Sequence, residues 1–325
     1  MGNVVSFDSV ESGVIDGFTI AGAENMRGAK VYCYDSSVVI THNLITSSLP
    51  PGAPEAKGVG VYCNACPLAH IARNRILGNY SDEYGGGIFL ISSPANVRTN
   101  LIASNTAESG GGGIYIFDGA PEIINNTIAN NTGLLGAGGI LNVQGTPHIS
   151  NCIIWGNGDD LEGVSLEMIN HCDIENGDFD QERGNISLDP LFKDPATGDV
   201  LANDYHIKVE SPCIDAATSA YVPSVDFDDE PVPFNYIEHG YYWFFFDGVE
   251  YMGSNAMYLS YFYYYYYYYL MEEELVPDVY EYVPQSRIDV DIGVDEVTDT
   301  DFDDVTDEVE RNEWGTDPFH IDTAN

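Results

Sequence analysis

The sequence predicts an all-β chain that winds into a solenoid of short stacked strands and ends in an irregular C-terminal extension. Three observations predict this fold class: a strand pattern that recurs at a nearly constant interval, a series of asparagines with the same interval, and the absence of helical periodicity between them. A fixed period of 26 to 30 residues is typical of stacked units, each of which buries its apolar side against its neighbours.

The first series consists of five short strands that step along the chain by 30, 27, 26 and 26 residues. Successive side chains of a strand point to opposite faces, so alternate residues of each copy should point into the solenoid. The predicted inward residues are Val31, Val61, Ile88, Ile114 and Ile140, with Cys33, Cys63, Leu90 and Ile116 two positions later. The predicted outward residues between them are Tyr32, Tyr62, Phe89, Tyr115 and Leu141.

The second series places an asparagine two residues before an isoleucine in each period. The asparagines are Asn43, Asn74, Asn100, Asn126 and Asn151, and the isoleucines are Ile45, Ile76, Ile102, Ile128 and Ile153. A third set repeats every 26 residues in turn-like sequence: Asn79, Asn105, Asn131 and Asn157. Asparagine tolerates left-handed backbone conformations, so we expect this set to occupy such positions in stacked corners. Each period then contains at least two strands and forms one coil of a β-solenoid.

Over about residues 12 to 180 this pattern resembles the right-handed parallel β-helix repeat proteins of the pectate-lyase-like superfamily. The resemblance implies a right-handed parallel β-helix of about six or seven coils, with neighbouring strands roughly 4.8 Å apart. It is a resemblance to the fold and not to any one enzyme of the superfamily.

Composition restricts the partners of the chain. Its 325 residues are 44% apolar, which is enough for a substantial core, and 52 acidic against 11 basic residues give a formal net charge of −41. Nucleic acid and anionic membranes are therefore excluded as partners of the whole surface. The first residues lack the basic and apolar regions of a secretion signal. We nevertheless interpret the chain as a fragment of an exported protein, located outside the cell or on its surface.

Six cysteines occur, at positions 33, 63, 66, 152, 172 and 213. Cys33 and Cys63 occupy the same place in neighbouring coils, so they are either stacked buried thiols or a bridge between coils. A third interpretation is a zinc site formed by Cys33, Cys63, Cys66 and His70, although the spacing does not match the usual zinc motifs.

The second half contains segments from Gly184 to Ala216, at 226–231 and at 291–296 that together resemble a choice-of-anchor Q domain over roughly 150–296. This resemblance implies export and attachment, although Asp229 stands where the family usually has glycine and no arginine follows Pro231. We divide the chain into β-helix repeats at 1–180, a closing region at 181–240, a tyrosine-rich low-complexity insertion at 241–285, the end of the closing region at 286–298, and an acidic calcium-binding-like tail at 299–325.

The insertion contains seven consecutive tyrosines, for which we have no functional account. It is interpreted either as an aromatic strand pair lying across the end of the β-helix or as low-complexity, aggregation-prone sequence. A membrane span is not favoured, because tyrosine prefers the interface to the centre of a bilayer.

The acidic tail carries oxygen ligands at the spacing of a calcium-binding loop. The predicted ligands are Asp299, Asp301, Asp303, the carbonyl of Val305, Asp307 and Glu310. The residues that follow, up to Pro318, resemble the bacterial thrombospondin type 3-like calcium repeats. Glycine usually fills loop position 6, where this chain has Asp304, at some cost in backbone strain. The alternative is an acidic tail that binds cations diffusely.

Three classes of function remain, and one of them is a calcium-dependent assembly module. The outward aromatic row Tyr32, Tyr62, Phe89 and Tyr115 predicts contact with a polysaccharide or cell-envelope glycan, unless another segment covers it. The sequence therefore favours an exported protein with a structural, adhesive or glycan-binding role. The rival is a carbohydrate-active enzyme, a polysaccharide lyase or glycoside hydrolase, for which Asp173, Glu175 and Asp178 are the weak catalytic candidates. The ligand and the oligomeric state are left open.

Overall fold

The computed structural model describes residues 3–22, 28–47, 59–175, 183–208, 210–214 and 216–218, and the backbone of residues 242–246 and 249–253. Within these ranges the chain is built of strands and turns, and its only helical element is the 3-10 turn Leu166–Met168. The predicted all-β class is confirmed. Asp178, the seven consecutive tyrosines and the acidic tail lie outside the described residues.

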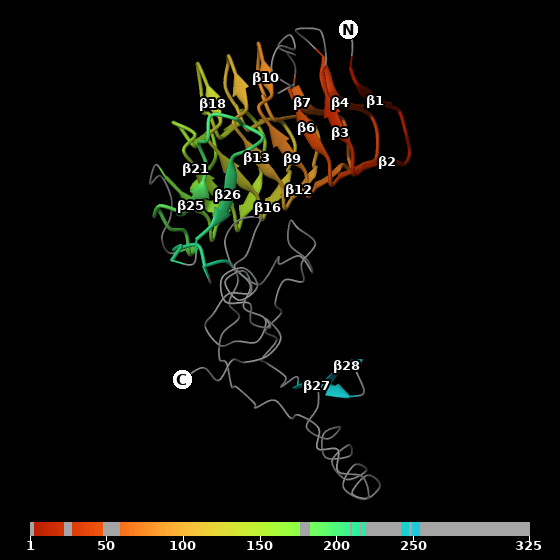
Figure 1. Cartoon of the computed structure of the whole chain (residues 1–325). Helices are drawn as coiled ribbons and strands as arrows, with labels where there is room; N and C mark the ends of the chain where they lie inside the picture. The colour runs from red at the N-terminus through yellow and green to blue at the C-terminus, as the bar shows by residue number, and fades with distance from the viewer. Residues whose placement is uncertain are drawn as a thin grey trace, which may run out of the picture. The chain divides into compact units, whose positions relative to one another are not determined.

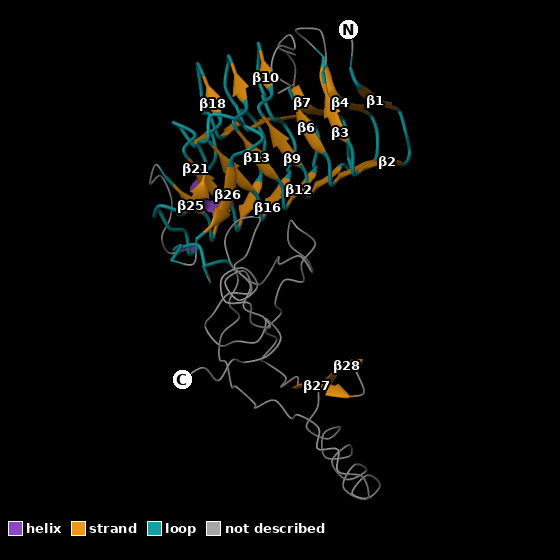
Figure 2. Ribbon diagram, viewed as in Figure 1, coloured by secondary structure: helices purple, strands orange, loops and turns teal. Residues whose placement is uncertain are grey.

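Each coil contributes one strand to each of three parallel seven-stranded sheets, which form the sides of the solenoid (Figures 1 and 2). Sheet A consists of β1 (Val5–Asp8), β4 (Ala29–Tyr34), β7 (Val59–Asn64), β11 (Ile88–Ile91), β15 (Ile114–Phe117), β19 (Ile140–Asn142) and β22 (Leu161–Glu162). Sheet B consists of β2 (Gly13–Asp16), β5 (Val38–Thr41), β8 (His70–Ala72), β12 (Asn96–Arg98), β16 (Glu122–Ile124), β20 (His148–Ser150) and β23 (Ile169–Asn170). Sheet C consists of β3 (Thr19–Ala21), β6 (Leu44–Thr46), β9 (Arg75–Leu77), β13 (Leu101–Ala103), β17 (Thr127–Ala129), β21 (Ile153–Trp155) and β24 (Asp173–Ile174).

A smaller sheet D fills the corner between sheet C and the next strand of sheet A. It contains β10 (Tyr80–Ser81), β14 (Thr106–Ala107) and β18 (Thr132–Gly133).

Strand register keeps equivalent residues in columns along the solenoid. In sheet A, Ile88 pairs with Val61 on one side and with Ile114 on the other. Every residue that the alternation predicted to point inward on this sheet is fully buried, including Cys33, Cys63 and Leu90. The repeat therefore produces one continuous core of like residues.

Two columns of buried asparagines join the coils inside the corners. After the first member of each column, the asparagine Oδ1 accepts hydrogen bonds from the backbone N–H and the Nδ2 of the asparagine one coil earlier, at 2.9 to 3.0 Å in the Asn100 and Asn105 coils. Each Nδ2 also donates to a backbone carbonyl of the preceding coil, as Asn100 does to Ile71 at 2.8 Å. The first column is Asn43, Asn74, Asn100 and Asn126, and the second is Asn79, Asn105, Asn131 and Asn157.

The prediction that Asn151 continues the first column is wrong by one residue. Ile128 pairs with Ile154, and Cys152 occupies the place below Asn126. The Cys152 thiol accepts from the Asn126 N–H at 3.4 Å and donates to the Ser150 carbonyl at 3.2 Å, so it satisfies the same backbone groups as an asparagine. Cys172 and Asn185 then continue the column.

The asparagines of the second column were also expected to adopt left-handed backbone conformations, and this expectation is wrong. In both columns the residue before the asparagine has the positive φ, for example Arg73 at 53°, Thr99 at 53° and Ser104 at 56°. The preceding residue makes the bend, and the asparagine keeps the conformation that directs its side chain inward to the next coil.

A short antiparallel hairpin, β25 (Phe192–Asp194) and β26 (Asp204–Ile207), lies over the outer face of sheet C (Figure 1). Phe192, Tyr205 and Ile207 pack there on a row of outward apolar side chains that includes Leu101 and Ile153. This closing hairpin converts the outer face of sheet C into a second core.

In a separate unit of the chain, β27 (Tyr242–Phe246) and β28 (Val249–Gly253) form an antiparallel pair. A strand pair was one of the two interpretations of the tyrosine-rich insertion. Among the described residues, no helix is long and apolar enough to cross a membrane.

Candidate functional site

The outward aromatic residues of sheet A form a stacked row. The ring centroids of Tyr32 and Tyr62 are 5.2 Å apart with the planes inclined by 6°, and Phe89 follows Tyr62 at 5.1 Å with the planes inclined by 34°. Phe89 and Tyr115 are 4.7 Å apart at 20°. The parallel register of β4, β7, β11 and β15 imposes this spacing, because it places the four residues opposite one another.

The row is open at one end and covered at the other. Tyr115 is only 6% exposed, because the Tyr84 ring lies 4.5 Å away and Leu141 follows in the next coil. Tyr32, Tyr62 and Phe89 are partly exposed. The ring faces are turned toward one another, so ring edges and hydroxyls remain for a ligand along the row. At the Tyr32 end the next residue in register is the exposed Ser6, which leaves one ring face without a stacked neighbour on β1.

Burial raises the pKa of Tyr32 and of Tyr62, so both phenols stay protonated at neutral pH and can donate a hydrogen bond. Two further aromatic side chains, Tyr34 and Phe117, are 43% and 37% exposed in the neighbouring outward column of the same sheet. Sheet A thus presents a row of aromatic side chains, with the exposed carboxylates Asp8 and Glu162 in its outward columns near the two ends.

The two acidic candidates that the structure describes, Asp173 and Glu175, do not form an exposed pair. Asp173 is fully buried under the closing segment, where its carboxylate accepts from the Leu188 N–H at 3.1 Å and from the Cys213 thiol at 3.2 Å. Burial raises the pKa of Asp173 to about 6. Glu175 is exposed and accepts from the Gly156 N–H at 3.0 Å. Asp178 lies outside the described residues. The geometry gives Asp173 a structural task, since its two oxygens tie the closing segment to sheet C.

All six cysteines are free and buried. Cys33 and Cys63 pair in register, and Cys66 is hydrogen-bonded to Cys63, which lowers the pKa of Cys66 to about 7. His70 is exposed on sheet B, away from the buried thiols. Within the described part of the chain no group of three or more His, Cys, Asp or Glu is arranged to hold a metal ion. The predicted calcium ligands lie outside that part.

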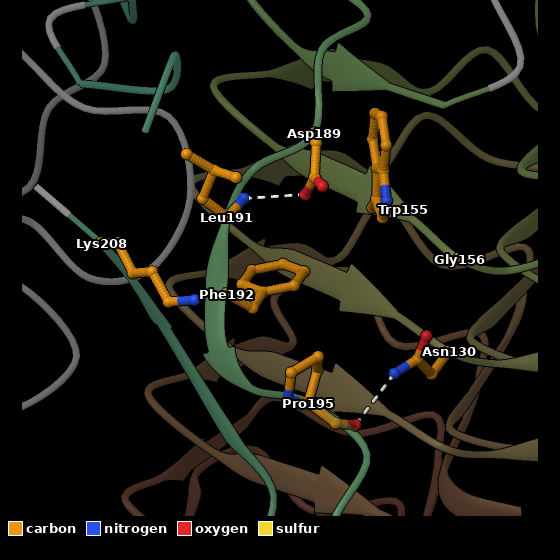
Figure 3. A pocket seen from close by; sticks show the side chains of 8 residues that line it. All are labelled: Asn130, Trp155, Gly156, Asp189, Leu191, Phe192, Pro195 and Lys208. Atoms are coloured by element: carbon orange, nitrogen blue, oxygen red, sulfur yellow. Dashed lines mark hydrogen bonds between the residues drawn. The ribbon is translucent and has the colours of Figure 1, made fainter. Parts of the chain in front are cut away.

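A cavity of about 300 Å³ lies between the outer face of sheet C and the closing hairpin (Figure 3). Trp155, Phe192 and Pro195 supply apolar walls, and Asn130, Asp189 and Lys208 supply polar groups. No sequence pattern predicts this site, because its residues are spread over 79 positions and meet only when the hairpin folds back on sheet C.

Comparison with known proteins finds a similarity in fold. Residues 59–187 match the family model of the right-handed β-helix region. No curated protein and no solved structure matched the chain. The matched residues are those whose strands stack in parallel in sheets A, B and C. Residues 59–187 are therefore similar to the right-handed β-helix region, and their strands form a parallel β-solenoid in this structure.

Proposed function

We propose that this chain is a non-catalytic glycan-binding β-helix protein that works at the cell surface or in the extracellular space. The observation that carries the proposal is the stacked row of Tyr32, Tyr62 and Phe89, partly exposed on sheet A with ring centroids 5.1 to 5.2 Å apart. Aromatic surfaces bearing hydroxyls combine apolar contact with hydrogen bonding, and this combination suits the C–H and O–H groups of sugars.

The electrostatics favour a neutral glycan over an acidic one. The chain carries a net charge of −41, and this field repels a polyuronate. The stacked rings hold one another in place, so a ligand pays little side-chain entropy on binding. A strand of sugars lying along the row would contact ring edges and phenol hydroxyls, and at Tyr32 it would also reach a ring face.

The rival function, a polysaccharide lyase or glycoside hydrolase, has less support. Asp173 is buried and engaged in hydrogen bonds, and Glu175 is the only exposed carboxylate of the candidates that the structure describes. Calcium binding by the acidic tail and attachment to the cell envelope belong to the proposal as expectations from sequence.

Affinity electrophoresis against a panel of neutral polysaccharides and one polyuronate tests this proposal. We expect retardation by at least one neutral polymer, weakened about tenfold or more in a Tyr32→Ala, Tyr62→Ala variant. Phe89→Ala should weaken it less than Tyr32→Ala, because Phe89 lies inside the row.

The matched control is Val39→Ala, which truncates a side chain that is 38% exposed on sheet B. Thermal unfolding of each variant checks that the solenoid is intact. The proposal fails if no neutral polymer retards the protein, or if the double variant and Val39→Ala behave alike. Release of reducing ends that is lost in Glu175→Ala would instead establish the enzyme.

A further inference from the structure

We infer that the cavity beneath the closing hairpin is a second saccharide site, which holds one neutral hexopyranose residue of a glycan. It lies on sheet C and shares no residue with the aromatic row on sheet A. The inference rests on the proposed function for the class of ligand, but its residues and its test are separate.

The apolar wall comes from the end of one column of sheet C. The residues in register before Trp155 are Ala129 and Ala103, so the indole is the first large side chain of its column after two methyl groups. Trp155 is partly exposed and faces the cavity beside Phe192 (Figure 3). Unlike the rings of sheet A, it has no stacked aromatic partner among the described residues. The exposed part of the indole lines the cavity and can contact the C–H side of a sugar ring.

The segment just before the hairpin fixes one acceptor that lines the cavity. Asp189 Oδ1 accepts from the Leu191 N–H at 2.9 Å, which holds the carboxylate in place (Figure 3). The side chain is exposed, and its second oxygen can accept from a sugar hydroxyl. Leu191 makes this turn in a left-handed conformation, with φ at 56°, which is uncommon for a side chain of its type.

Asn130 supplies a second acceptor because both of its amide hydrogens are used elsewhere. Its Nδ2 donates to the Pro195 carbonyl at 3.1 Å and to the Tyr205 hydroxyl at 3.2 Å, so the orientation of Oδ1 is determined. The neighbouring Gly156 keeps the space beside this oxygen clear: a Cβ there would lie 2.4 Å from Oδ1. Lys208, exposed at the edge of the cavity, supplies a donor.

These groups favour a neutral polyol. The charges of Asp189 and Lys208 cancel within the cavity, so no excess of positive charge compensates an anionic ligand for the negative field of the chain. The two fixed acceptors and the one donor match vicinal hydroxyls on one side of a pyranose. The indole matches the C–H groups on the other side of the sugar ring. The volume of about 300 Å³ is at the small end of ligand sites, which limits the occupant to one ring.

The test is titration of the full chain with methyl glycosides of glucose, galactose, mannose and N-acetylglucosamine, followed by saturation-transfer NMR, with methyl glucuronide as the anionic comparison. We expect saturable binding of at least one neutral glycoside, weakened at least tenfold by Asp189→Asn and lost in Trp155→Ala. Asp194→Asn is the matched control, because it removes the same charge from an exposed position on the same hairpin that does not line the cavity.

The Tyr32→Ala, Tyr62→Ala variant separates the two sites. If it loses polysaccharide binding while glycoside binding is absent throughout, the function on sheet A stands and the inference about the cavity is overturned. If glycoside binding persists in that variant and disappears in Asp189→Asn, the cavity is a site in its own right. The inference about the cavity would also be overturned if only the glucuronide bound, or if Asp189→Asn and Asp194→Asn weakened glycoside binding equally.

Discussion

Replacing Asn100 by alanine should destabilise the solenoid more than any surface substitution. Its side chain is fully buried and makes five hydrogen-bond contacts. Oδ1 accepts from the N–H and the Nδ2 of Asn74, and Nδ2 donates to the carbonyls of Ile71 and Arg98 and to Asn126 Oδ1. Because an amide has two hydrogens, four of these bonds can be well formed at one time.

At about 1 kcal/mol for each bond, the loss amounts to about 4 kcal/mol in the free energy of unfolding. Most of this loss comes from backbone groups left buried without a partner, above all the Asn74 N–H. Asn100→Cys should cost about half as much, because Cys152 already satisfies the equivalent groups in its own coil. The matched control, Asn96→Ala, removes one exposed bond to Glu122 and should cost less than about 0.5 kcal/mol.

Urea unfolding followed by circular dichroism and by tyrosine fluorescence measures these differences. Stacked repeats can unfold in parts, so the two transitions must coincide before a free energy is taken from the midpoint. The view that the asparagine column holds the coils together would be refuted if Asn100→Ala lowered the free energy of unfolding by less than about 1 kcal/mol. It would also be refuted if Asn100→Cys were no more stable than Asn100→Ala.

Three further outcomes are expected. Burial raises the pKa of Asp173 from an unfolded value of about 3.9 to about 6, so the native protein binds more protons than the unfolded protein between these pH values. The contribution of Asp173 to the free energy of unfolding should therefore fall by about 3 kcal/mol as pH rises through this window, and the urea midpoints of Asp173→Asn should lack this fall. Parallel pH profiles of the two proteins would contradict the buried carboxylate. The six buried thiols should react slowly with Ellman's reagent in native protein and all react in urea, whereas a titre of fewer than six in urea without reductant would mean that a bridge exists. Calorimetric titration with calcium at moderate salt should give saturable binding that Asp301→Ala, Asp303→Ala abolishes; weak binding unchanged in the variant would reduce the tail to a diffuse cation binder.

The sequence predicts the interior of this fold better than its surfaces, for a physical reason. Inward residues repeat because every coil must offer its neighbour the same shape, so Val61, Ile88 and Ile114 could be placed from period and alternation alone. The prediction at Asn151 was wrong by one residue because residue identity is not what the solenoid requires. It requires only a donor and an acceptor at that place, which the Cys152 thiol supplies. The cavity lined by Trp155 and Asp189 could not be predicted, because its position depends on how a hairpin outside the repeat packs on sheet C.

Repetition also determines where this solenoid can bind a ligand. In a column of aromatic rings, each ring face that points along the solenoid axis contacts the ring of the neighbouring coil, as for Tyr62 between Tyr32 and Phe89. A ligand can gain the most contact area where the column is interrupted, because one ring face there has no neighbouring ring. Sheet A is interrupted at Ser6, next to Tyr32, and sheet C is interrupted where Trp155 follows two alanines. Both sites that we propose lie at such interruptions. Their side chains point outward, whereas the asparagines that hold the coils together point inward, so a residue of either site can change without altering the hydrogen-bonded columns.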